Sequence, residues 1–267
     1  MIGRLSTLVL VLGLGAGAAG LWYYRSDRGP SKSSPSADEL AVENDWLETL
    51  HSQNPRIAED AAARVSAMGA AAIPEVLAVL RDPGAETARK KAALKACGIL
   101  GPIARPAVND VAAHLPIPDY TTEAAVALSF MGRDAFPPLR EGLNSDDPIV
   151  RRESLRSLGK LRERAPLDPR AVVPLLLEGL EDPEASVRAV AATYLGIIHE
   201  SPATVVPALV EMLADGDTEV RSAAAGALGS FGPAAESAIP ALRKAAGDRD
   251  ENVAREAGLA LVKLQKQ

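Results

Sequence analysis

Apolar and polar residues follow one another along most of the chain with the spacing of amphipathic helices. Within each stretch the apolar residues recur at intervals of three and four, which places them on one face of an α-helix. The pattern also repeats: Pro174, Pro207 and Pro240 are 33 residues apart, and Leu180 and Leu213 each lie six residues after the first two prolines. A constant period of this length is typical of a helical solenoid, in which short units stack in a row.

A second marker extends the repeat towards the N-terminus. An apolar residue followed by a small or polar one ends each unit, and successive copies are 32, 31, 30, 37, 33 and 33 residues apart. Seven repeats therefore fill the chain from about residue 40 to the C-terminus, and the long step is explained by an inserted loop at residues 163–170. The apolar residues of the marker are Met68, Leu100, Met131, Leu161, Ile198, Phe231 and Leu264.

Each repeat is predicted to contain two helices. The first is expected to open at a proline, as at Pro74, Pro174 and Pro207, because proline lacks the N–H that the first turn leaves without a partner. An acidic turn is then expected to cap the second helix, whose buried side carries valine, alanine and leucine, as in residues 220–229 (VRSAAAGALG). The predicted fold class is all-α, an α-α superhelix of about seven two-helix repeats that follows an N-terminal hydrophobic segment.

The repeat motif P-x-L-x-x-x-L-x-D-x-x-x-x-V-R-x-x-A-A-x-x-L-G is clearest at residues 174–196 and 207–229. It resembles the HEAT repeat, specifically the bacterial HEAT-like or phycocyanobilin-lyase-like type. This resemblance implies protein–protein contact as the usual role, with a few enzymatic branches. It also implies that the arginine of each V-R pair contacts the acidic turn of a neighbouring repeat, so a structural ladder is expected from Arg151, Arg188 and Arg221.

The N-terminus differs in composition from the repeats. Residues 5–24 carry no charge, are long enough to span a bilayer, and end in aromatic residues followed by arginine. We interpret residues 1–28 as a signal anchor, with a signal peptide cleaved near residue 18 as the alternative. Residues 29–39 form a Ser/Pro-rich linker, and residues 40–267 form the repeat domain.

Two opposing signals bear on the orientation in the membrane. An apolar segment with almost nothing before it usually exports the domain behind it, so we expect a single-pass anchor with a periplasmic repeat domain. Positive charge is more frequent after the segment than before it, which favours a cytoplasmic-facing domain instead. Secretion after cleavage is a third alternative.

Composition and motifs argue against most catalytic chemistry. The three histidines fall in different repeats, so no metal site is expected, and phosphate-loop, serine-elbow and paired-cysteine motifs are absent from the sequence. The lone Cys97 lies among alanines and is predicted to be a core residue. We therefore expect no cofactor and a non-enzymatic protein. The alternatives are a bilin-lyase-like enzyme or accessory subunit, and a nucleic-acid-binding HEAT array, which the net charge of −6 disfavours.

Charge is unevenly distributed once the repeats are aligned. With the concave face assigned as in HEAT repeats, its exposed second-helix positions carry a net charge of +6, which leaves −12 for the rest of the chain. We expect this face to bind an acidic protein or peptide segment that also offers apolar side chains; the alternative is that these cations only keep a helical surface soluble. The predicted partner-binding residues are Lys91, Lys95, Ile99, Val126, Phe130, Arg152, Arg156, Lys160, Arg255 and Lys263.

Overall fold

The computed structural model describes residues 45–164 and 167–265, and all regular structure in these ranges is helical. Seven helix pairs follow one another along them, so the predicted all-α superhelix of about seven two-helix repeats is confirmed. The predicted anchor or signal peptide (1–28) and the linker (29–39) lie outside the described residues.

Each pair consists of a first and a second helix, and short 3-10 turns (η1–η4) precede four of the first helices. The first helices are α2 (Trp46–Leu50), α4 (Ile73–Arg81), α6 (Val108–Ala112), α8 (Phe136–Gly142), α10 (Pro169–Gly179), α12 (Pro202–Met212) and α14 (Ile239–Ala245). The second helices are α3 (Pro55–Met68), α5 (Thr87–Leu100), α7 (Thr121–Phe130), α9 (Pro148–Arg164), α11 (Ala185–Ile198), α13 (Thr218–Phe231) and α15 (Glu251–Gln265).

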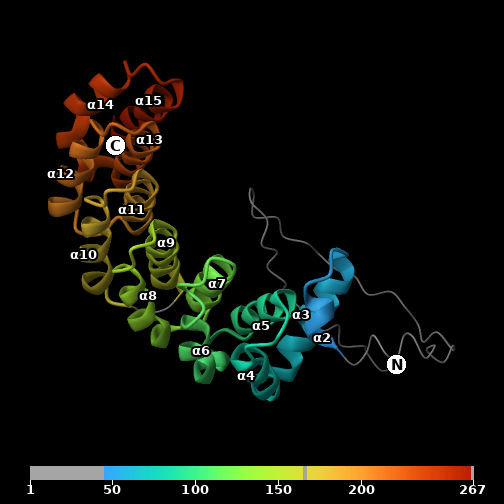
Figure 1. The fold of residues 1–267 in the computed structure, drawn as a ribbon. Coiled ribbons are helices and arrows are strands. Elements are labelled where there is room, and N and C mark those ends of the chain that lie inside the picture. Colours follow the sequence, from blue (N-terminus) through green and yellow to red (C-terminus); the bar gives the residue numbers. More distant parts are fainter. Residues whose placement is uncertain (1–44, 165–166, 266–267) are drawn as a thin grey trace, which may run out of the picture. The chain divides into compact units, whose positions relative to one another are not determined.

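The two sets of helices form two layers of a curved stack. From α5 to α15, each second helix packs on the next, and in Figure 1 they follow the inner side of the curve while the first helices follow the outer side. Small residues bring the inner helices close together. A Cβ added to Gly196 would lie 2.6 Å from the Cα of Ala227, and one added to Gly229 would lie 3.0 Å from the Cα of Ala260. The inner layer is therefore tightly spaced, and the second helices line a concave face.

The core is an aliphatic seam between the two layers. Leucine supplies most of its largest fully buried side chains, for example Leu128, Leu158 and Leu195. Cys97 is fully buried in the same seam, as predicted, and burial raises the pKa of its thiol to about 12. The thiol is therefore protonated at neutral pH and packs as a small apolar side chain.

The predicted acidic caps are confirmed for α9, α13 and α15, which aspartates of the preceding turns cap, but not for α5 and α11, which begin without a side-chain capping hydrogen bond. The Asp217 carboxylate accepts hydrogen bonds from the backbone N–H groups of Glu219 (2.8 Å) and Val220 (3.3 Å). Asp250 accepts equivalent bonds at the start of α15, at 2.9 and 3.2 Å. These bonds satisfy N–H groups that the first turn of a helix otherwise leaves without partners.

The predicted helix starts are wrong in two repeats. Pro174 and Pro207 lie inside α10 and α12, which begin five residues earlier, at Pro169 and Pro202. Proline inside a helix removes one backbone hydrogen bond and frees the carbonyl four residues upstream. In both helices that carbonyl belongs to a solvent-exposed residue, where water can satisfy it, so an extra turn is tolerated.

The predicted inserted loop at residues 163–170 is also too long. Helix α9 continues to Arg164, which makes it 17 residues long, and α10 already begins at Pro169. Asp168 caps α10 by accepting a 2.9 Å hydrogen bond from the backbone N–H of Arg170. Three of the extra residues therefore lengthen α9 beyond Leu161 and add Arg162 and Arg164 to its last turn, whereas α10, at 11 residues, is as long as α12.

One continuous helical stretch of the described residues, Pro55–Arg81, is long and apolar enough to cross a membrane by length and composition. It is divided at Gly69, whose φ of +54° ends α3 before η1 and α4 begin. We therefore assign it to the first two repeats. The predicted membrane segment, residues 5–24, lies outside the described residues and stays a prediction.

Candidate functional site

An arginine on each of three second helices joins neighbouring repeats. Arg188 donates from Nε and Nη2 to the two carboxylate oxygens of Asp215 in the next turn, at 2.8 and 2.9 Å. Its Nη1 donates to the backbone carbonyls of Asp182 (2.8 Å) and Pro183 (3.0 Å) in the turn of its own repeat. One guanidinium thus clamps two successive turns in a fixed register, with the bidentate geometry that arginine makes with carboxylates.

Arg151 and Arg221 repeat this arrangement. Arg151 donates to Asp182 at 2.8 and 2.9 Å, and Arg221 donates to Asp248 at 2.8 and 3.1 Å. Hydrogen bonds from the arginines hold the pKa of Asp248, and likewise that of Asp215, below the usual range. We call these three pairs the arginine ladder. It spaces the layers that carry the concave face.

Helix α9 carries the densest positive charge on that face. Arg152, Arg156, Lys160 and Arg164 recur every four residues and form what we call the cationic stripe. Beneath it lies Glu153, which is only 3% exposed. Its Oε1 is 3.0 Å from Arg152 Nε and 3.7 Å from Arg156 Nη1. This buried carboxylate holds both guanidinium groups on the stripe.

Lys160 has a different environment from the arginines of the stripe. Its side chain is half-buried and, within the described part of the chain, makes no hydrogen bond or ion pair. Burial lowers the pKa of its ammonium group, and the charges of Arg156 and Arg164 lower it further. Arg164 is itself engaged, since its guanidinium carbon lies 4.2 Å from the ring centroid of Phe130 on α7.

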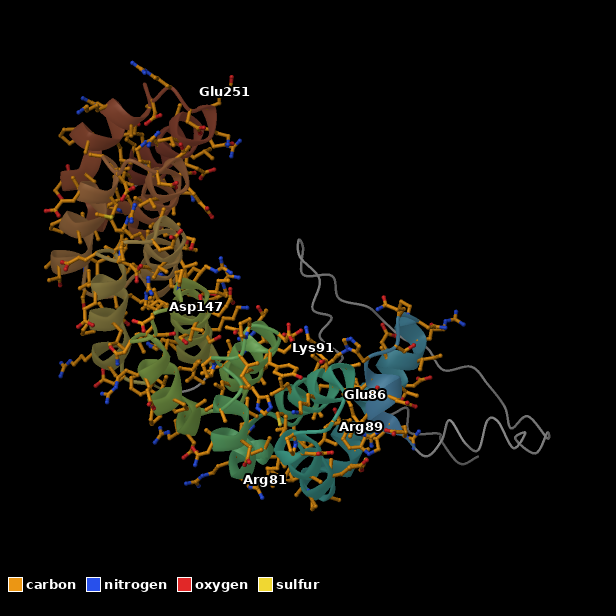
Figure 2. The ribbon with its side chains drawn as sticks, viewed as in Figure 1. Arg81, Glu86, Arg89, Lys91, Asp147 and Glu251 are labelled. Carbon is orange, nitrogen blue, oxygen red and sulfur yellow. The ribbon has the colours of Figure 1, made fainter. Side chains whose placement is uncertain are left out.

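Three of the remaining cations of the predicted face have partners within the protein. Lys91 on α5 forms a 2.8 Å ion pair with Glu123 on α7, and Figure 2 shows Lys91 on the inner side of the curve. Lys95 donates to the backbone carbonyl of Leu50 at 3.0 Å. Arg255 lies 3.3 Å from Glu256. The concave face is therefore less basic than the aligned sequence suggests, and its positive charge is concentrated on α9.

The apolar residues of the predicted face lie on α5 and α7. Ile99, Val126 and Phe130 are each half-buried, so their side chains fill the space between neighbouring helices and still reach the surface. Phe130 contributes its ring to the contact with Arg164. Lys263, the last of the predicted residues, is exposed near the end of α15. The structure thus brings Phe130 together with the cationic stripe and places Lys263 three second helices further along the stack.

A hollow of about 860 Å³ adjoins the stripe on the concave face. It lies over α11, α13 and α15, with Arg156 on one side and Arg255 on the other. Its lining combines hydroxyl-bearing side chains, small residues and a few larger apolar groups. These include Thr193, Tyr194, Ile197, Ser222, Gly226 and Ser230, together with the carboxylates of Glu219 and Glu256.

Reasoning from the sequence missed Glu153 and the carboxylates near the hollow. Glu153 occurs between Arg152 and Arg156, and its spacing of one and three residues from them is the signal that could have identified it as their shared partner. Glu256 could have been found in the same way, because it directly follows Arg255. Glu219 had no such signal, because its relation to the hollow depends on how α11, α13 and α15 pack.

The histidines do not converge. His114 is buried, its Nδ1 lies 2.8 Å from the backbone carbonyl of Asp110, and its ring meets Tyr120 edge-on at 5.3 Å. His199 ends α11 and meets Phe231 edge-on at 6.5 Å. In the ranges 45–164 and 167–265 no three His, Cys, Asp or Glu side chains are grouped so that they could hold a metal ion.

Comparisons with known proteins agree with this architecture. The family model for HEAT repeats matches residues 173–262, and the model for the PBS lyase HEAT-like repeat matches residues 150–182, which include most of α9. A comparison with curated proteins found no match.

Two solved structures with TM-scores of 0.50 or more have a similar fold, and a third is similar at a lower score. Importin beta is 16% identical in sequence to this chain, with a TM-score of 0.58, and the match covers 80% of this chain and 32% of the importin beta chain. An engineered protein is 21% identical, with a TM-score of 0.50 over 86% and 69% of the two chains. The complex of CpcE and CpcF of phycocyanin lyase from Nostoc sp. PCC7120 is 24% identical, with a TM-score of 0.49 over 58% and 98%. The matched residues, 150–182 and 173–262, thus carry HEAT-type repeats, and the seven helix pairs have the architecture of a HEAT-repeat solenoid.

Proposed function

We propose that the protein is an interaction scaffold whose concave face binds an acidic segment of a protein partner. The observation that carries this proposal is the cationic stripe of α9 on a chain whose net charge is −6. A positive patch on an otherwise acidic protein attracts an acidic partner to one place and repels it elsewhere.

The geometry around the stripe suits a peptide. Glu153 already holds Arg152 and Arg156 in place, so less side-chain entropy is lost when they bind. The hollow beside Arg156 offers hydroxyl groups for backbone hydrogen bonds and apolar surface at Ile197 and Tyr194. An acidic side chain over α9, followed by apolar side chains in the hollow, is the arrangement that these features support.

A selection from displayed random peptides tests the proposal. Wild-type protein should enrich peptides that are net acidic and contain apolar residues, and their binding should weaken as salt screens the charges. A variant with Arg152→Gln, Glu153→Gln, Arg156→Gln and Lys160→Gln removes three of the four cations of the stripe without leaving a buried carboxylate unpaired. Its affinity for the selected peptides should fall about tenfold or more.

The matched control lies on the outer layer. Arg243→Gln with Lys244→Gln on α14 changes the net charge by −2, as the stripe variant does, and both residues are exposed. This control should bind the selected peptides as wild type does. If the wild-type protein enriched basic peptides, it would not have a site for acidic segments. If the stripe variant and the α14 control lost the same amount of affinity for the selected peptides, the binding would not be specific to the stripe.

A lyase-like role is the second candidate. It is favoured by one observation, that the PBS lyase HEAT-like match at residues 150–182 includes most of α9 and the stripe. Its test is a visible absorption band from a bound chromophore, or transfer of a bilin to an acceptor protein. Either result would favour a lyase-like role over the non-enzymatic scaffold, because a scaffold is expected neither to bind a chromophore nor to transfer a bilin.

We also propose that residues 5–24 attach the repeat domain to a membrane on its exported side. The support is the uncharged length and aromatic end of this segment. Protease added to intact spheroplasts should digest the repeat domain if it is periplasmic. Protection until the membrane is permeabilised would instead place it in the cytoplasm.

A further inference from the structure

The cationic stripe places like charges next to one another along a single helix face. Arg152, Arg156, Lys160 and Arg164 are each four residues from the next, a spacing at which side chains on a helix are neighbours and like charges repel. An anion bound across the stripe relieves this repulsion. The stripe is thus a surface whose stability improves when it is occupied.

The charges near the stripe do not balance. Two carboxylates on α9, the buried Glu153 and the exposed Glu163, accompany the four cations of the stripe. The other two cations of the helix, Arg151 and Arg162, pair with Asp182 and Glu200 on other elements, so the stripe keeps a net charge of +2. The outer cations are already engaged, Arg152 with Glu153 and Arg164 with Phe130. The centre is Lys160, which in the described part of the chain has no hydrogen-bonding or ion-pair partner, with Arg156 one turn away.

We infer that the anchoring group of the partner is a phosphorylated side chain, bound between Arg156 and Lys160. This inference rests on the proposed function and specifies its ligand. A phosphate monoester carries a charge of about −1.5 to −2 near neutral pH and three acceptor oxygens. It therefore matches the net charge of +2, whereas a single carboxylate neutralises only half of it. The arginine can donate two parallel hydrogen bonds and the lysine can add a compact charge.

The surroundings of the stripe indicate that the phosphate is carried by a protein. The hollow of about 860 Å³ continues from Arg156 over α11 and α13, and it gives the chain on one side of the phosphorylated residue a place to lie. The stripe also belongs to the inner layer of the curve, a surface that a flat bilayer contacts poorly. A phosphorylated peptide thus fits better than a lipid headgroup.

Oriented peptide libraries test this inference directly. Three libraries share randomised flanking positions and differ at one fixed residue, which is phosphoserine, glutamate or serine. Immobilised full-length protein should retain the phosphoserine library at least tenfold better than the serine library, and clearly better than the glutamate library. Inorganic phosphate at millimolar concentration should compete with the retained peptides.

Lys160→Met is the decisive variant, and Lys244→Met on the outer helix α14 is its control. Methionine keeps the length of the half-buried side chain and removes its charge, so Lys160→Met should fold with an unchanged or raised melting temperature. It should nevertheless lose most of the preference for phosphoserine, and Lys244→Met should keep it. Loss of the preference in both variants, or in neither, would overturn the assignment to this stripe.

The outcomes separate the inference from the proposed function. If glutamate and phosphoserine libraries are retained equally, the acidic-segment function stands and the phosphate assignment is wrong. If no library is retained and the display selection also fails, the proposed function is wrong as well. If vesicles containing phosphatidylinositol phosphates are retained and the peptides are not, the ligand is a lipid and the inference is overturned.

Discussion

The four C-terminal repeats (residues 136–265) and the three N-terminal repeats (residues 45–131) hold their layers together differently. In the C-terminal repeats one device recurs at all three junctions, an arginine that binds the aspartate of the next turn. The N-terminal junctions use contacts that occur once each. Arg89 pairs with Asp45, Arg81 pairs with Asp110, and the Trp46 indole donates a 2.8 Å hydrogen bond to Glu75.

The difference shows how sequence regularity relates to structural register. Where each repeat carries the V-R pair, the same side chains meet at every junction, even across the 37-residue step from Arg151 to Arg188, and one rule fixes the stacking of several layers. Where the pair is absent, Ala58 and Thr121 stand at the ladder position, and other residues must supply the contact. Repeats in a solenoid contact mainly their neighbours, so the stability of each part depends on its own junctions.

The largest expected effect comes from the close contacts between inner helices. Gly196→Ala places a Cβ 2.6 Å from a backbone Cα of α13, which has to move, so we expect a loss of about 3 kcal/mol in the free energy of unfolding. Gly258→Ala is the matched control, because a Cβ there has no neighbour within 4 Å. Alanine favours the helix at that position, and a gain of up to about 1 kcal/mol is expected. Urea unfolding measures the free energy of unfolding of both variants. Equal changes in Gly196→Ala and Gly258→Ala would contradict the tight spacing of the inner helices.

The next effect separates the ladder from the N-terminal ion pairs. Arg188→Met should cost about 2 kcal/mol, because the side chains of Arg188 and Asp215 are 18% and 8% exposed and the carboxylate would lose its hydrogen bonds. Arg81→Met should cost much less, because the Arg81 side chain is 62% exposed and its ion pair is in contact with water. Urea unfolding followed by circular dichroism compares the two variants. An equal or larger loss for Arg81→Met would show that the ladder is not the stronger junction.

The smallest effect concerns pH. Hydrogen bonds from Arg188 hold the pKa of Asp215 below its usual range, so their contribution is complete above the unfolded pKa of about 3.9. It is lost as the pH falls through the lower folded pKa, because the unfolded state then binds the proton more readily. The urea midpoint of wild type should therefore fall between about pH 5 and pH 2. In the Arg188→Met variant the urea midpoint should fall less steeply with decreasing pH. If the midpoints of the variant and of wild type fell in parallel, Asp215 would not be the cause of the pH dependence.

Much of the fold could be predicted from the sequence, because the repeat depends on local patterns. Apolar spacing, acidic caps and the 33-residue step are visible along the chain and needed no knowledge of distant contacts. The extra turns before Pro174 and Pro207 could not be predicted in this way, since they depend on whether the residues four positions upstream are exposed to water in the folded stack.

The binding face was harder to predict than the fold. Aligning the repeats identified the inner positions but counted each charge as if it were free. The pair between Lys91 and Glu123 joins two repeats, and it depends on how α5 and α7 are offset. The bond from Lys95 to the carbonyl of Leu50 likewise joins two repeats. Contacts of this kind lie between units and are not visible within the repeat motif, so the concentration of charge on α9 emerged only in three dimensions.

The close backbone contacts of Gly196 and Gly229 also have a mechanical consequence. A curved stack that bends further shortens its inner side, and here that side is already at van der Waals contact through bare main-chain atoms. These contacts leave the inner helices little room to move closer together, so we expect the repeats that carry them to deform more easily towards a straighter arc than towards a tighter one.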